Sequence, residues 1–133
     1  MEVSDYCLDT NAYSAFARGH RGMLTLVDSS RWIGLPVVVL GELEGGFGHG
    51  AKTALNRALL DAFEKEAFVH TLPVNQIVAK IYGEMYVELR KSGRPIPQND
   101  MWIAAIAIAA RVPLVTYDRH FDRVPDLVTL APV

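Results

Sequence analysis

Four acidic residues in this chain stand where a helix or a strand is expected to begin or end. Asp9 and Asp118 each follow a short apolar run, so each is predicted to lie at the carboxyl end of a buried strand. Asp100 precedes a long run that is apolar on all sides, which predicts a buried helix with Asp100 in its first turn. Glu42 lies on a helix predicted directly after the second strand. If the strands are parallel, all four carboxylates converge on the sheet edge where such folds bind ligands.

The chemistry of such a cluster follows from its charge, because grouped carboxylates repel one another unless a cation neutralises them. Hard oxygen ligands without a set of cysteines and histidines favour Mg²⁺ (or Mn²⁺) over Zn²⁺. A cation bound there polarises a phosphate, lowers the pKa of a bound water and stabilises the leaving oxygen. The acids therefore predict a divalent metal centre suited to phosphoryl chemistry.

Several of these residues also have simpler structural explanations. Asp9 and Asp100 could each serve only as a helix N-cap, and taken singly neither reading is favoured. Asp122 is equally compatible with an acid that reaches the metal through water and with a surface acid. The four histidines show no paired spacing and are predicted to be surface or loop residues: His20, His49, His70 and His120. The shared context of the four acids favours the metal site over capping alone.

Strands alternate with helices along the chain, which predicts a parallel α/β sandwich. The predicted strands are residues 6–9, 32–35, 67–72, 112–117 and 126–130. The predicted helices are residues 10–18, 21–30, 37–44, 51–66, 74–92 and 101–111, with Asn99 as N-cap of the last and a flexible glycine-rich break at 45–50. Apolar residues expected to form inward faces are Met23, Leu24, Leu26 and Val27 in the second helix and Leu55, Ala58, Leu59, Ala62 and Phe63 in the fourth.

The bulk composition sets further limits. The chain has 133 residues, 50% of them hydrophobic, and no internal repeat, so one domain spanning residues 1–133 is expected. The formal net charge is -2, so if the chain binds nucleic acid, it does so through local basic groups or a bound cation. The single cysteine, Cys7, excludes an internal disulfide framework. The lack of a signal-peptide pattern and of any membrane-spanning apolar run predicts a soluble, cytoplasmic protein.

Four short motifs occur in series along the chain. They are Leu8-Asp9-Thr10-Asn11, Gly41-Glu42-Leu43, Asn99-Asp100 before an Ile/Ala-rich helix, and Leu114-Val115-Thr116-Tyr117-Asp118-Arg119-His120-Phe121. Over nearly its whole length the chain thereby resembles the PIN-domain ribonucleases, and among them the toxins of VapBC toxin–antitoxin systems. The resemblance implies a three-layer sandwich with a central parallel sheet flanked by helices, Mg²⁺- or Mn²⁺-dependent endonucleolytic cleavage of RNA, a homodimer, and inhibition by a small cognate antitoxin.

The same resemblance assigns roles to individual residues. Asp9, Glu42, Asp100 and Asp118 become the metal-binding acidic quartet, and Thr116 a hydroxyl beside it that orients a ligand or the attacking water. Asp122 matches a further acid found in some family members. Because an activated water attacks phosphorus, the products are expected to carry 3′-hydroxyl and 5′-phosphate ends. The homodimer is expected to use helix 74–92, which carries more aromatic surface than one small sheet needs.

Other functions remain open at this point. A Mg²⁺-dependent phosphatase with Asp9 as nucleophile would require a second aspartate where the chain has Asn11. A receiver-like phosphoacceptor would require a late lysine, whereas Lys91 is the last lysine in the chain. A non-catalytic RNA- or protein-binding module, in which the acids only cap helices, would show no saturable binding of Mn²⁺.

Overall fold

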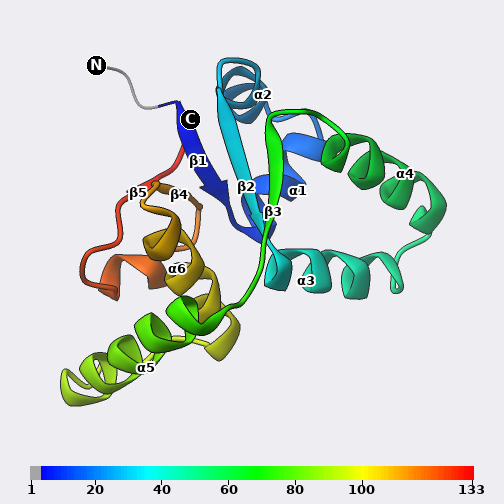
Figure 1. The fold of residues 1–133 in the computed structure, drawn as a ribbon. Helices are drawn as coiled ribbons and strands as arrows, with labels where there is room; N and C mark the ends of the chain where they lie inside the picture. The colour runs from blue at the N-terminus through cyan, green and yellow to red at the C-terminus, as the bar shows by residue number, and fades with distance from the viewer. Residues whose placement is uncertain (1–3) are drawn as a thin grey trace.

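The computed structural model describes residues 4–133, so the first three residues of the predicted 1–133 domain lie outside it. In chain order its elements are β1 (Asp5–Leu8), α1 (Thr10–Ala17), α2 (Arg21–Asp28), β2 (Trp32–Pro36), α3 (Val37–Phe47), α4 (Thr53–Glu64), β3 (Val69–Leu72), α5 (Gln76–Lys91), α6 (Gln98–Ala110), β4 (Leu114–Val115), the 3₁₀ helix η1 (Arg119–Arg123) and β5 (Thr129–Leu130). Figure 1 shows their arrangement. Among these described helices, none is long and apolar enough to cross a membrane.

The strands form one parallel sheet in the order β3-β2-β1-β4-β5 (Figure 1). The chain adds strands in one direction from β1 to β3 and then returns to the other side of β1 with β4. Because parallel crossovers are right-handed, this reversal places α5 and α6 on the face opposite the earlier helices. The predicted α/β sandwich with a central parallel sheet is thereby confirmed. The carboxyl ends of the paired strands β1 and β4 therefore form a topological switch point, which is where open α/β sheets bind ligands.

The two strands at the switch point and helix α6 form the centre of the core. Cys7 and Leu8 of β1 are fully buried, as are both residues of β4. Helix α6 is apolar on all sides, as predicted, and its buried residues are Met101, Ile103, Ala104, Ala105, Ile106 and Ala107. A helix buried in this way has little freedom to shift against the sheet. Its first turn, which contains Asp100, therefore has a fixed position near the strand ends.

Two local predictions are wrong. Asn99 is not the N-cap, because α6 begins at Gln98 and its N-cap is Pro97. A proline, with its fixed φ and missing N–H, suits the residues that open a helix. The glycine-rich break is also shorter than predicted, since α3 continues through Gly45 and Gly46. A glycine costs a helix only about 1 kcal/mol relative to alanine, so it weakens a helix without ending it.

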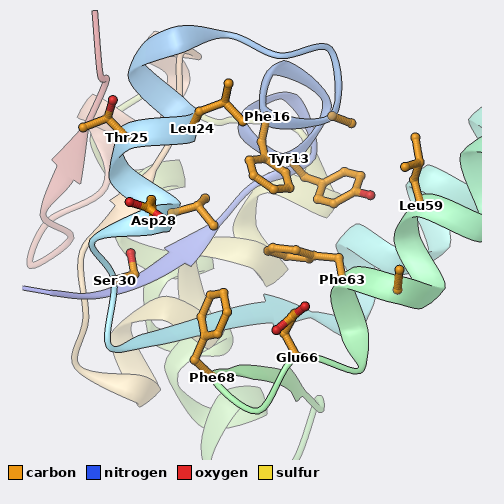
Figure 2. Close-up of a pocket in the computed structure, with 13 residues that line it drawn as sticks. Tyr13, Phe16, Leu24, Thr25, Asp28, Ser30, Leu59, Phe63, Glu66 and Phe68 are labelled. Carbon is orange, nitrogen blue, oxygen red and sulfur yellow. The ribbon is translucent and has the colours of Figure 1, made fainter.

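The apolar faces of α2 and α4 are only partly covered. Leu24 of α2, predicted to face inward, is 44% exposed, and Leu55 and Leu59 of α4 are 54% and 45% exposed. A groove of ≈ 850 Å³ lies between these helices and α1 (Figure 2). Its aromatic and aliphatic lining includes Tyr13, Phe16, Leu24, Leu59, Phe63 and Phe68. The predicted apolar stripes therefore exist, but part of each faces this groove instead of the core.

Candidate active site

Asp9 lies at the switch point because of the register between β1 and β4. Leu8 pairs with Val115, so the next residues along the two strands, Asp9 and Thr116, become neighbours. The Thr116 hydroxyl donates a hydrogen bond to Oδ2 of Asp9. Oδ1 of Asp9 accepts the backbone N–H of Ala12 at 2.8 Å, so Asp9 is also the N-cap of α1. The capping reading and the site reading of Asp9 are thus compatible.

Asp118 is positioned by the turn that follows β4. Its backbone N–H donates to Oγ1 of Thr116 at 3.0 Å. Its own Oδ1 accepts the backbone N–H of His120 at 2.9 Å and caps η1. An aspartate that accepts the N–H two residues ahead closes a tight local turn. This turn brings the side chain of His120 back toward the carboxylate of Asp118.

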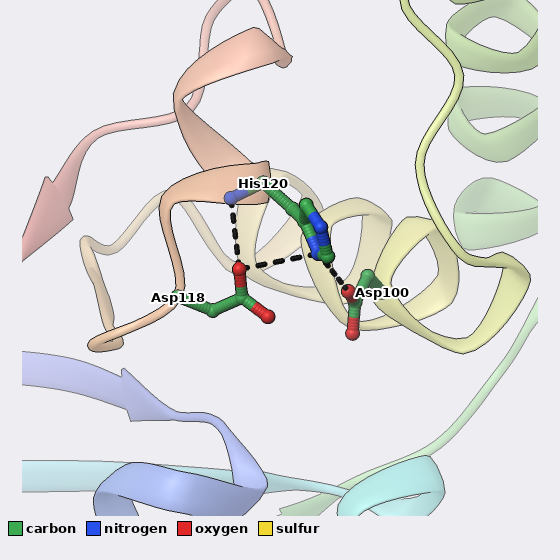
Figure 3. A group of neighbouring side chains, drawn as sticks. All are labelled: Asp100, Asp118 and His120. Atoms are coloured by element: carbon green, nitrogen blue, oxygen red, sulfur yellow. Dashed lines mark hydrogen bonds and ion pairs between the residues drawn. The ribbon is translucent and has the colours of Figure 1, made fainter.

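Asp100 faces this turn from the first turn of α6. The His120 Nδ1 atom lies 3.4 Å from Oδ2 of Asp100 and 3.1 Å from Oδ1 of Asp118. Figure 3 shows the imidazole pointing between the two carboxylates. One ligand atom from each of these three side chains lies within 4.8 Å of the others. The structure therefore brings two of the four predicted acids together with a histidine.

Glu42 approaches the same edge of the sheet from α3. Its Oε1 accepts the hydroxyl of Thr10, the first residue of α1, at 2.6 Å. The charge of Glu42 contributes to raising the pKa of Asp100. Among residues 4–133, however, the compact group of possible ligand atoms contains neither Glu42 nor Asp9. These two acids border the group without being part of it.

The electrostatics of the site are those of crowded acids. Burial is the main reason that the pKa of Asp9 is raised from 3.8 to about 6. The hydrogen bonds from Thr116 and Ala12 lower this pKa, whereas the charges of Asp100 and Asp118 raise it further. Only 4% of Asp9 is exposed. The pKa of Asp100 is also raised, first by burial and then by the charge of Asp118, while His120 acts in the opposite direction. Without a cation, charging these carboxylates is unfavourable.

The site suits a hard divalent cation. The Nδ1 atom of His120 is within ion-pair distance of two carboxylates, yet neither contact has hydrogen-bond geometry. Among the residues that the structure describes, Nδ1 of His120 is the one side-chain nitrogen or oxygen that is shielded from solvent and lacks a hydrogen-bond partner. Ligand atoms adjacent on one octahedral Mg²⁺ lie about 3.0 Å apart, close to the observed 3.1 and 3.4 Å. A positive ion among these groups would relieve both the repulsion and the unsatisfied nitrogen.

The structure also places His120 and Asp122. The sequence predicts a surface or loop histidine at His120, and its side chain is 42% exposed; what the sequence does not predict is that it lies in the compact group. Its signal in the sequence is the spacing from Asp118, since an acid that closes such a turn draws the second following residue toward itself. Asp122 is exposed, and its carboxylate lies 3.8 Å from Nε of Arg119. This placement agrees with the surface alternative for Asp122.

A carboxylate site at the switch point of a parallel α/β sheet is the arrangement that the sequence motifs implied. The chain belongs to the PIN-domain family, whose pattern matches residues 6–127. Its relatives within that family include VapC ribonucleases. Ribonuclease VapC2 of Rickettsia felis is 33% identical over 131 residues, covering 92% of this chain and 94% of the relative. Ribonuclease VapC5 of Mycobacterium tuberculosis is 32% identical over 114 residues, covering 86% and 83%.

Solved structures give the same result. The crystal structure of VapBC2 from Rickettsia felis, bound to a DNA fragment from its promoter, has a TM-score of 0.84 and 30% identity. The matched region covers 96% of the present chain and 98% of the chain in that structure. The structure of VapBC-1 from Haemophilus influenzae has a TM-score of 0.82 at 25% identity, with coverages of 95% and 96%. These similarities do not favour the phosphatase, receiver or non-catalytic alternatives.

Proposed function

We propose that this chain is a metal-dependent endoribonuclease that acts as the toxin of a toxin–antitoxin module. The observation that carries the proposal is the group of Asp100, Asp118 and His120 at the switch point of a PIN-domain sheet. The curated relatives are named as ribonucleases. PIN nucleases generally use a divalent metal, and this acidic group supplies ligands of the right kind.

The contacts of each residue suggest its role in this reaction. Asp100 and Asp118 would hold Mg²⁺ or Mn²⁺ together with Asp9, whose carboxylate oxygens keep lone pairs beyond the hydrogen bonds they accept. When bound, the cation supplies charge neutralisation at the phosphate and a more acidic water. Glu42 keeps one oxygen free of the Thr10 contact, so it can accept a proton from the attacking water. Thr116 orients Asp9 by its hydroxyl.

Cleavage of a labelled RNA tests the chemical class directly. We expect cleavage in the presence of Mg²⁺ or Mn²⁺ and none in excess EDTA. We also expect 5′-phosphate and 3′-hydroxyl ends on the products, because water and not the ribose 2′-hydroxyl attacks phosphorus. A 2′,3′-cyclic phosphate on the products, or full cleavage in EDTA, would contradict the proposed mechanism.

The partner proposed for this chain is a small antitoxin, because similar structures are described as VapBC complexes. The groove between α1, α2 and α4 offers it an apolar site of ≈ 850 Å³. Amphipathic helices bind such grooves through apolar residues spaced along one face. Asp28 and Glu66 lie at the lining, and they suit a segment with a basic side chain at its border.

A charge placed in the groove tests this docking. We expect Leu59→Asp to leave the toxin folded and active but to prevent co-purification with the cognate antitoxin, because burying an unpaired carboxylate is unfavourable. The matched control is Val128→Asp, since Val128 is 64% exposed and does not line the groove. Retention of the antitoxin by the Leu59 variant would place the partner elsewhere on the toxin.

A homodimer through α5 remains a prediction of the sequence. On this helix Tyr86 is 40% exposed and Val87 is 50% exposed, so the helix has apolar surface available to a second copy. We expect light scattering at tens of micromolar to give the mass of a dimer for the wild type and of a monomer for Val87→Glu. Leu55→Glu on α4 is the control, and a monomeric wild type would exclude this dimer.

A further inference from the structure

We propose that His120 binds the active-site cation through Nδ1 and that this nitrogen ligand gives the site a preference for Mn²⁺ over Mg²⁺. The inference rests on the proposed metal-dependent function and adds a ligand and a choice of ion to it. The acidic residues by themselves predicted only a hard cation with oxygen ligands.

The position of the imidazole is the first support for this assignment. Nδ1 of His120 lies 3.1 Å from Asp118 and 3.4 Å from Asp100. Two elements fix that position, since the turn after β4 carries His120 while α6 carries Asp100. Figure 3 shows the ring edge directed into the space between the two carboxylates. A cation bound by both carboxylates would therefore lie within reach of this nitrogen.

The state of the nitrogen atom is the second support. Nδ1 of His120 is shielded from solvent and lies within ion-pair distance of both carboxylates, but neither contact has hydrogen-bond geometry. The side chain as a whole is 42% exposed. A neutral imidazole protonated on Nε2 presents a lone pair at Nδ1. Most buried polar atoms in folded proteins have a partner, so an exception requires an explanation. A metal ion supplies the missing partner, and the exposed side of the ring leaves Nε2 free to bond water.

The ion preference follows from the donor set. Mg²⁺ strongly prefers oxygen ligands and keeps several waters. An imidazole nitrogen is a better ligand for first-row transition ions. Mn²⁺ accepts both carboxylate oxygen and imidazole nitrogen, and the carboxylates of the site together with one imidazole match that mixture. Replacing one oxygen by a nitrogen should therefore favour Mn²⁺ without excluding Mg²⁺.

A competing role for His120 makes the opposite prediction. The imidazole could act only as a counter-ion that separates Asp100 and Asp118 until a metal displaces it. In that case removing the side chain would remove a competitor, and both cations would bind more tightly. The sign of the change in affinity therefore distinguishes a ligand from a counter-ion.

The experiment measures metal binding by the full chain with isothermal titration calorimetry, using Mn²⁺ alone and Mg²⁺ alone. For His120→Ala we expect roughly a ten-fold or greater loss of Mn²⁺ affinity and a smaller loss for Mg²⁺. His120→Asn offers an oxygen near the position of Nδ1, so it should recover Mg²⁺ binding while keeping a reduced ratio of Mn²⁺ to Mg²⁺ affinity. His49→Ala, in the exposed turn after α3, is the control and should bind both ions like the wild type.

Electron spin echo spectroscopy of the Mn²⁺ complex gives a readout independent of activity. We expect modulation from a directly bound ¹⁴N in the wild type and in His49→Ala, and its loss in His120→Ala. Tighter binding of both ions by His120→Ala, or no nitrogen signal in the wild type, overturns the ligand assignment alone. If the wild type binds neither ion saturably, the proposed metal-dependent nuclease fails as well, so the two failures are distinguishable.

Discussion

Asp100→Asn is expected to abolish metal-dependent RNA cleavage, by at least about a hundred-fold, while the protein stays folded. Asparagine has the shape of aspartate but lacks its charge, so it removes a metal ligand without changing the packing of α6. The contacts of Asp100 also argue against a structural role. Helix α6 has no side-chain N-cap hydrogen bond. Burial, followed by the charge of Asp118, raises the pKa of Asp100, which means that its charge is unfavourable in the folded state.

The matched control for this variant is Asp122→Asn. Asp122 is half exposed and lies in ion-pair contact with the exposed Arg119, so neutralising it should leave cleavage near the wild-type rate. Thermal melting in EDTA separates catalysis from folding, since Asp100→Asn should melt at or above the wild-type temperature. A lower melting temperature for Asp100→Asn would indicate that Asp100 serves mainly to stabilise the helix.

The places of Asp9, Asp100 and Asp118 in the fold agree with their prediction, because local sequence determines where these elements begin and end. A strand that ends at Asp9, a strand that leads to Asp118 and a buried helix that begins near Asp100 are all visible as apolar runs. Parallel pairing then places the ends of the strands together, because the topology of α/β sheets allows few alternatives. The sequence could therefore place the four acids near one edge of the sheet, and the structure brings Asp100 and Asp118 into one compact group there.

His120 could not be found in the same way. Its side-chain position depends on the turn that Asp118 closes and on the approach of α6 from a distant part of the chain. Neither contact leaves a periodic pattern, and an isolated histidine after a strand is common on protein surfaces. The spacing of His120 from Asp118 indicates the turn, but the approach of Asp100 is a tertiary contact that has no signal along the chain.

The groove between α1, α2 and α4 could not be predicted from the sequence, for a different reason. Amphipathic spacing shows that a helix has an apolar face but does not show what covers that face. Leu59 and Leu24 follow the pattern of core residues, yet both are partly exposed at the groove. A partner chain can complete a hydrophobic contact as well as the chain itself does. An amphipathic helix that remains open in the monomer is therefore informative about binding.

The metal-free protein is expected to lose stability as the pH rises from about 4 to about 7, and Asp9 is the cause. Its pKa is raised from 3.8 to about 6 in the folded state, so the folded protein binds this proton more tightly than the unfolded chain does. The contribution is fully present below the unfolded pKa and is lost as the pH rises through the folded one. One pKa unit corresponds to about 1.4 kcal/mol, so the loss is on the order of 3 kcal/mol.

Denaturant unfolding in EDTA at several pH values measures this loss. Asp9→Asn should remove most of it, because asparagine keeps an oxygen for the N–H of Ala12 and cannot ionise. Asp5→Asn is the matched control at the other end of β1. The pKa of Asp5 is lowered by its hydrogen bond with Arg31, so its contribution is lost on acidification, and the fall toward neutral pH should remain in that variant.

Mn²⁺ at about one hundred times its dissociation constant should restore about 2.7 kcal/mol to the wild type at neutral pH. It should restore much less to Asp9→Asn, which lacks one of the charges that the cation neutralises. If the free energies of unfolding of the wild type and Asp9→Asn differ by a constant amount across the pH range, Asp9 stays ionised in the folded protein. In that case the Thr116 hydroxyl and the Ala12 N–H would be sufficient to stabilise its charge without a metal.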